Sequence, residues 1–174
     1  MRWLWIDRIV SLEPGQRLVA IKNVSMAEDH LHDHFAADEA SGRPASPIMP
    51  ASLIVEGMAQ TAGILVGHTG AFREKVILAK VSNATLEADA TPGTTLRYEA
   101  ELKSFDTVGA SCQGVVSLID PVAPGEATAI GQIDLVFSHL DQNRAGLAFP
   151  DHNFVFGPSF KMILEQSGID LPAE

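Results

Sequence analysis

The longest apolar stretch of the chain runs from Ala51 to Val66, and it predicts a helix that is buried on nearly all sides. Its only charged residue is Glu56, and Gln60 follows four positions later, so both side chains share one helix face. A carboxylate is costly to bury, so it is either compensated by partners or retained for chemistry. We expect the helix to end near Gly67 or Gly70.

Alternating apolar and polar residues predict strands on both sides of this helix. The clearest case is Thr95–Leu102, in which every second residue is apolar, while Pro14-Gly15 separates two β-rich runs as a hairpin turn would. The expected strands are Ile6–Glu13, Arg17–Val24, Val76–Ala90, Thr95–Phe105, Ala110–Asp120 and Ala127–Leu140. Short turns suit antiparallel pairing, and a helix that is apolar on most sides needs a sheet around it. We therefore expect an α+β fold in which a curved antiparallel sheet wraps around a central helix.

Two further segments lie outside this pattern. Ala36–Ser46 is small and polar, so we interpret it as a loop. We assign residues 1–142 to one domain and residues 143–174 to a C-terminal extension that packs on it or on a dimer partner. In the extension, Ser159–Leu164 is expected to open a short amphipathic helix, and Phe149, Phe154 and Phe156 need cover.

Composition narrows the functional classes. The formal net charge of -10 over 174 residues argues against non-specific binding to nucleic acid or to an anionic membrane, because both require a positive field. Cys112 is the only cysteine, so we expect no internal disulfide, a reducing compartment and a core thiol. Asp7 and Arg8 interrupt the apolar N-terminus before a signal-peptide core can form, which favours a cytoplasmic protein.

Several short motifs occur in the same order as in one known family. They are Trp5-Ile6-Asp7-Arg8-Ile9, Glu13-Pro14-Gly15, Ala20-Ile21-Lys22-Asn23-Val24, His34-Phe35, Pro47-Ile48-Met49-Pro50 and Glu56-Gly57-Met58-Ala59-Gln60. With the predicted fold, this combination resembles the hotdog-fold 3-hydroxyacyl-acyl-carrier-protein dehydratases (Z type) of fatty-acid biosynthesis. The resemblance covers about Trp3 to Gln142.

The resemblance implies a reaction and its residues. Members of this family remove water from (3R)-3-hydroxyacyl thioesters to give trans-2-enoyl thioesters, without a cofactor. By motif position, His34 takes the proton next to the thioester carbonyl and Glu56 assists departure of the hydroxyl. The N–H of Ala51, at the start of the helix, is the expected oxyanion donor. The expected substrate-binding residues are Phe35, Met49, Pro50 and Gln60.

The resemblance also implies partners. The substrate is carried by acyl carrier protein or coenzyme A, and family members pair into a homodimer in which His34 of one subunit faces Glu56 of the other. Gln60 either orients a neighbouring group or packs within that dimer interface. Because acyl carrier proteins are acidic, docking on this acidic chain requires a local basic patch. The candidates are Arg73, Lys75, Lys80, Arg97 and Lys103.

Four departures from the family pattern indicate a divergent member with a changed substrate entrance. Asp33 and Ala51 replace glycines, and the longer segment Ala36–Ser46 replaces a short Pro-Gly link. Gly57 stands where alanine is usual, which costs helix stability of roughly 1 kcal/mol.

Two other functional classes stay open. One is a hotdog acyl thioesterase, which does not need a histidine in the HF motif, and the other is a non-catalytic acyl-binding subunit with a remodelled site. On a strand, His30, His32 and His34 would share one face and could bind a metal. Since no matching cysteine or carboxylate pattern accompanies them, we expect no metal site.

Overall fold

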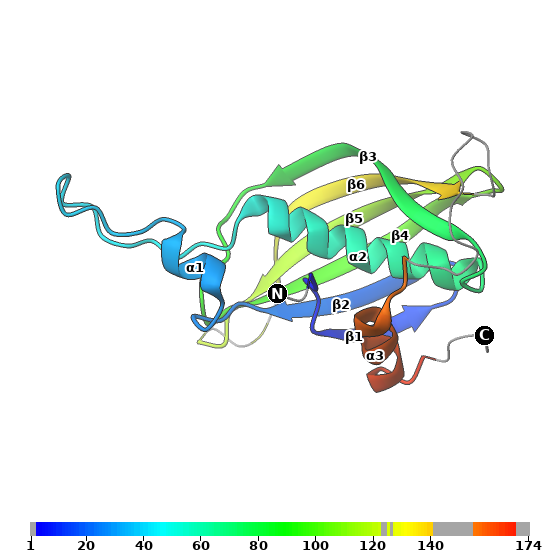
Figure 1. Ribbon diagram of the computed structural model, residues 1–174, viewed down its shortest axis with the longest axis horizontal. Helices are drawn as coiled ribbons and strands as arrows, with labels where there is room; N and C mark the ends of the chain where they lie inside the picture. The colour runs from blue at the N-terminus through cyan, green and yellow to red at the C-terminus, as the bar shows by residue number, and fades with distance from the viewer. Residues whose placement is uncertain (1–2, 123–124, 126, 141–154, 170–174) are drawn as a thin grey trace.

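The computed structural model describes residues 3–122, 125, 127–140 and 155–169, and they form an antiparallel sheet wrapped around a long helix (Figure 1). The elements are β1 (Arg8–Glu13), β2 (Arg17–Asn23), α1 (Asp29–Asp33), α2 (Ala51–Thr69), β3 (Lys75–Leu86), β4 (Thr95–Phe105), β5 (Gly109–Ile119), β6 (Thr128–Leu140) and α3 (Pro158–Gln166). The sheet has six strands in the order β1-β2-β4-β5-β6-β3. This architecture confirms the predicted α+β hotdog fold.

Helix α2 lies across the concave face of the sheet, as Figure 1 shows. The alternation in β4 explains how the sheet receives it: Leu96, Tyr98 and Ala100 are buried, whereas the residues between them are only partly buried. Tyr98 is paired with Ala20 of β2 and with Val116 of β5, which places it in the middle of the sheet. The expected half-buried strand is therefore confirmed.

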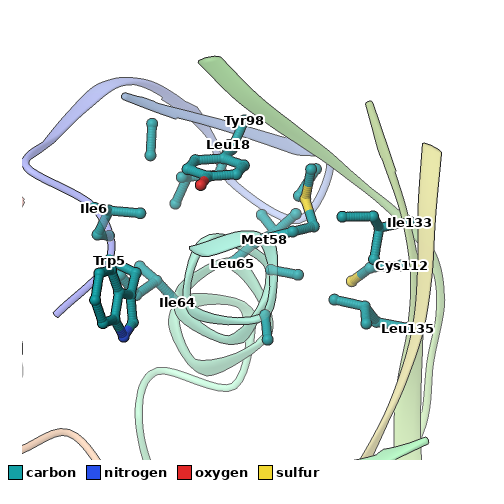
Figure 2. Packing of buried hydrophobic residues seen from close by; sticks show 14 of the residues in the cluster. Trp5, Ile6, Leu18, Met58, Ile64, Leu65, Tyr98, Cys112, Ile133 and Leu135 are labelled. Carbon is teal, nitrogen blue, oxygen red and sulfur yellow. The ribbon is translucent and has the colours of Figure 1, made fainter. Parts of the chain in front are cut away.

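The core lies between α2 and the strands. Figure 2 shows Leu18 and Tyr98 above the helix and Cys112, with Ile133 and Leu135, on the strands to its right. Cys112 is buried, and burial raises the pKa of its thiol to about 12, so it is protonated at neutral pH. This agrees with the prediction of a core thiol.

The structure corrects three predictions of local conformation. β3 ends at Leu86 and not at Ala90. Residues Asp29–Asp33 are helical, so His30, His32 and His34 do not alternate along a strand. Helix α2 ends at Thr69 as expected, but it is not buried all round, because its first residue, Ala51, and the next one are exposed. A free helix N-terminus is where unpaired N–H groups are available.

The segment Ala36–Ser46 is a paired arm that extends away from the sheet (Figure 1). Asp38 and Arg43 exchange two backbone hydrogen bonds of 2.9 and 3.0 Å, and Phe35 and Ser46 exchange two of 3.1 and 2.9 Å. Its residues are exposed apart from Asp38, so the arm contributes little to the core.

The described part of the extension, residues 155–169, packs near the end of α2 and against the edge strand β1. Helix α3 contains the predicted Ser159–Leu164 segment, with Ile163 and Leu164 buried. The N–H of Ile9 donates to Ser167 Oγ (3.3 Å), which ties the edge strand to the residue after α3. Phe149, Phe154 and the boundary between residues 142 and 143 lie outside the described residues. Within the described ranges, no helix is long and apolar enough to cross a membrane.

Candidate active site

His34 is held in one orientation by the segment that leads into α2. Its Nδ1 lies 2.7 Å from the carbonyl oxygen of Ile48, and the N–H of Ile48 donates to the His34 carbonyl (3.1 Å). A carbonyl oxygen can only accept, so Nδ1 carries the hydrogen and the neutral ring keeps its lone pair on Nε2. The ring of Phe35 stacks on the imidazole with centroids 4.2 Å apart. Nε2 is therefore the ring nitrogen that can accept a proton.

The residues after Ile48 fix the N-terminus of α2. Met49 is buried, and its N–H donates to the Ala90 carbonyl (2.8 Å). Pro50 is the N-cap, and its carbonyl accepts hydrogen bonds from the third and fourth helical residues. The N–H groups of Ala51 and Ser52 belong to the first turn, where a helix has no acceptors of its own for them. They form a site suited to a developing oxyanion.

These groups share one pocket. It has a volume of about 600 Å³, and it is lined by His34, Phe35, Ile48, Met49, Pro50, Ala51, Ser52 and Ile54 together with residues 86–89. The structure thus brings together five of the seven predicted site residues. A histidine and a helix N-terminus that line the same pocket supply the base and the oxyanion donors that proton removal next to a carbonyl requires.

Glu56 and Gln60 are joined by a hydrogen bond on α2. Gln60 Nε2 donates to Glu56 Oε1 (2.9 Å), and Gln60 Oε1 accepts the N–H of Trp5 (2.8 Å). Gln60 is 6% exposed, and the hydrogen bond from the Trp5 N–H holds its amide in this orientation. The apolar residues around Glu56 in the sequence predict a fully buried carboxylate. In the single chain Glu56 is only half-buried.

Trp3 is a contact of Glu56 that the sequence analysis missed. Its Nε1 donates to Glu56 Oε1 (3.2 Å), and its ring packs edge-on against Trp5 with centroids 5.6 Å apart. Both donors bind Oε1, and no donor among the described residues contacts Oε2. The available signal was the pair of tryptophans at the N-terminus of an acidic chain with few aromatics. It indicates a contact without identifying the partner.

His34 and Glu56 do not meet within one chain. Glu56 and Gln60 line a separate pocket of about 220 Å³ that continues along α2, and His34 does not line it. From Ala51, which lines the His34 pocket, to Glu56 the helix advances about 7.5 Å and turns roughly 140°. Ala51 and Glu56 therefore project from different sides of α2. The predicted catalytic pair is therefore divided between two pockets of the chain.

The predicted basic residues are not one free patch. Arg97 pairs with Glu99 and Lys103 pairs with Glu101 on β4, while Lys75 is buried. As for metals, the described residues contain no group of three or more His, Cys, Asp or Glu side chains that could hold an ion.

Comparison with known proteins identifies relatives across most of the chain. Residues 1–123 match the family model of the FabA-like domain. The 3-hydroxyacyl-acyl-carrier-protein dehydratase FabZ of Acetivibrio thermocellus is 37% identical over 149 residues, which are 82% of this chain and 88% of that protein. The enzyme of the same name from Listeria monocytogenes is 36% identical over 140 residues, covering 80% of this chain and 87% of its own length.

Solved structures share the fold at low identity. A thioesterase family protein from Silicibacter pomeroyi superposes with a TM-score of 0.58 at 15% identity, over 76% of this chain and 83% of that one. The PaaI protein of E. coli superposes with a TM-score of 0.56 at 9% identity, over 79% and 81% of the two chains. At such identities the similarity concerns the fold alone.

Proposed function

The chain belongs to the FabA-like family, and we propose that it removes water from (3R)-3-hydroxyacyl thioesters to give trans-2-enoyl thioesters in fatty-acid biosynthesis. One observation supports this reaction above the others. His34 has its Nδ1 bound to a carbonyl and lines the same pocket as the first turn of α2. Dehydration needs a base beside an oxyanion site, whereas thioester hydrolysis by a helix carboxylate does not need His34.

The residues divide the chemistry between them. His34 Nε2 takes the proton from the carbon next to the thioester carbonyl, and the N–H of Ala51 stabilises the negative charge that builds on the carbonyl oxygen. The electron pair then forms the new carbon–carbon double bond as the bond to the hydroxyl breaks. The carboxyl group of Glu56 gives that hydroxyl its proton, so it leaves as water. Gln60 and Trp3 hold the Glu56 carboxyl through Oε1.

A complete site requires a second copy of the chain under this proposal. In one chain, His34 and Glu56 line different pockets. We propose a two-fold homodimer in which His34 of each subunit meets Glu56 of the partner. The edge strand β3 is available for pairing: Leu78 and Val81 on it are 40% and 39% exposed. Pairing would cover an apolar edge that a lone subunit leaves open.

The substrate carrier is either acyl carrier protein or coenzyme A, and the proposed mechanism uses no cofactor. The name of the relatives specifies an acyl-carrier-protein substrate. The sole cysteine, buried and with a raised pKa, is compatible with work in the reducing cytoplasm. We accordingly place the enzyme there, without nucleic-acid or membrane partners.

One incubation tests the proposed function. The purified protein is mixed with a (3R)-3-hydroxyacyl thioester, and both enoyl thioester and free thiol are followed by mass spectrometry. We expect enoyl product, and its absence from a folded His34→Ala variant. Free thiol without enoyl product would indicate a thioesterase, and no turnover on either carrier would indicate an acyl-binding subunit; either result would reject dehydration.

A further inference from the structure

A pocket with a mostly apolar lining runs along α2 from Glu56 toward the C-terminal extension. Glu56, Gln60 and Gly63 are spaced along one helix face, over about 10 Å of the helix axis. The walls come from α2, β3 and β6 and include Ile64, Val76, Leu78 and Phe137. The pocket therefore has a polar end at the proposed acid and apolar sides beyond it, which is the chemistry of an acyl thioester whose reacting carbons lie next to its alkyl chain.

Two aromatic residues of the extension line this pocket. Phe156 and Phe160 contribute to its wall, and their ring centroids lie 6.2 Å apart, edge to face. Phe156 is 6% exposed and also packs edge-on against Phe72, with centroids 4.9 Å apart. A Cβ at position 67 would lie 2.4 Å from Phe156 Cζ, so Gly67 leaves the space that this ring fills. The ring is held where it is by the helix and by its aromatic neighbours.

We propose that Phe156 and Phe160 close the acyl-chain pocket and set the longest chain that the enzyme accepts. This inference rests on the proposed function, since it takes Glu56 as the reacting end. The pocket of about 220 Å³ is smaller than the roughly 300–1,000 Å³ that encloses drug-sized ligands, so short chains fit it best. Both rings lie beyond residues 1–123, which match the family model, so this limit is specific to the extension of this chain.

The competing explanation is that the two rings only anchor the extension. Phe160 separates the explanations because it is half-buried, so shortening it disturbs the core less than shortening Phe156. Phe160→Ala deepens the pocket and Phe160→Trp shortens it. Leu164→Ala is the matched control: Leu164 is fully buried in the same helix but does not line the pocket.

A second variant narrows the pocket from the α2 side without harming the fold. At Gly63, the nearest atom to an added Cβ is Phe137 Cε1 at 3.7 Å, which is ordinary van der Waals contact. Alanine also favours the helix over glycine. Gly63→Ala therefore fills the pocket in a protein at least as stable as the original.

The experiment measures kcat/KM on (3R)-3-hydroxyacyl thioesters from butyryl to palmitoyl length. We expect Phe160→Ala to raise kcat/KM about tenfold or more for the first chain length that the unmodified enzyme rejects, relative to the shortest. Phe160→Trp and Gly63→Ala should move the chain-length limit to shorter chains. Leu164→Ala should lower the melting temperature but leave the chain-length limit unchanged. The inference would be overturned if the longest accepted chain were unchanged in both Phe160→Ala and Gly63→Ala, or if Leu164→Ala changed it in the same way. Neither result would contradict the dehydration reaction itself.

Failure of the proposed function gives a different result. If no chain length yields enoyl product, the dissociation constants of saturated acyl-coenzyme A thioesters are measured by calorimetry on the same proteins. If Gly63→Ala loses affinity only for longer chains and Phe160→Ala gains it, Phe156 and Phe160 limit the chain length in a protein that is not a dehydratase. Equal affinities across these proteins would reject that limit.

Discussion

Tyr98 occupies the space beside the backbone of Gly57: a Cβ at position 57 would lie 2.5 Å from both Cζ and the hydroxyl oxygen of the Tyr98 ring. Tyr98 is fully buried, and its hydroxyl has no hydrogen-bond partner among the described residues. Burial holds the pKa of this phenol above its usual value, so it stays neutral. The glycine that departs from the family pattern is therefore matched by a large ring on the facing strand.

We predict that Gly57→Ala destabilises the protein although alanine is the better helix former. The helix gains roughly 1 kcal/mol, but the clash with a fully packed ring costs about 1–3 kcal/mol. Urea unfolding should therefore show a lower free energy of unfolding for the variant than for the unmodified protein.

Changes at Tyr98 distinguish this clash from a backbone effect. Tyr98→Leu should rescue part of the loss in the double variant, because the ring is gone. Tyr98→Phe should not, because Cζ and Cε2 would stay 2.5 and 2.8 Å from the new Cβ. Gly57→Ala is made alone, with Tyr98→Leu and with Tyr98→Phe, and each loss is measured against the protein that keeps Gly57. Equal losses in all three backgrounds would contradict the proposed contact.

Local pattern was sufficient for most of the fold. A long apolar run placed α2 and the alternation of apolar and polar residues placed the strand β4, because the helix packs in the core and the strand buries one face against it. Local pattern failed where pairing joins distant segments. Trp3 binds Glu56 across 53 residues, and Gly57 faces Tyr98 across the core, and in neither contact does the local sequence identify the partner. Motif position supplied His34 and Glu56, but only the structure shows that they line different pockets.

Acid should weaken the protein through Glu99. Arg17 and Arg97 bind its two oxygens at 2.6 Å each, and Arg17 most strongly lowers the pKa of this carboxyl. A folded-state pKa below the unfolded value contributes stability above the unfolded pKa, and that stability is lost as the pH falls through the folded pKa. Because the pair is partly exposed, we expect Glu99→Gln to cost about 1 kcal/mol at neutral pH.

Thermal melts from neutral pH to about pH 3 check this prediction, because both proteins should converge once Glu99 is protonated. The control is Glu101→Gln, which removes an exposed pair with Lys103 on the same strand and should change little. A difference between Glu99→Gln and the unmodified protein that persists undiminished at low pH would argue against an ionic contribution.

Glu56→Gln should keep the fold and lose most dehydratase activity. The amide is nearly isosteric and can still accept from Gln60 and Trp3, but it cannot give a proton to the departing hydroxyl. General acid–base groups contribute about 10²–10⁴-fold, so a loss of kcat in that range is expected. Circular dichroism verifies folding, and Glu101→Gln, which alters an exposed carboxylate on β4 that lines neither pocket, serves as the control. Unchanged turnover in folded Glu56→Gln would sink the assignment of the acid.

The arm Ala36–Ser46 should affect substrate choice more than stability. It follows His34-Phe35, and its two sides are joined by the backbone pairs Asp38–Arg43 and Phe35–Ser46. Because it buries almost nothing, replacing it with a short Pro-Gly link should change the melting temperature little. Acyl-chain preference, measured as kcat/KM, should change. A large fall in melting temperature with unaltered preference would refute this role.

Mixing two inactive proteins tests the shared site. His34→Ala and Glu56→Ala are unfolded together and refolded as a mixture, with each variant refolded alone as a control. If His34 of one subunit works with Glu56 of the other, a mixed dimer has one site with both defects and one site with none. Random pairing makes about half of the dimers mixed, so roughly a quarter of the original activity should return. If each subunit instead used its own pair, every site would carry one defect. Mixed dimers shown by native mass spectrometry to have formed, yet without activity, would reject the shared site.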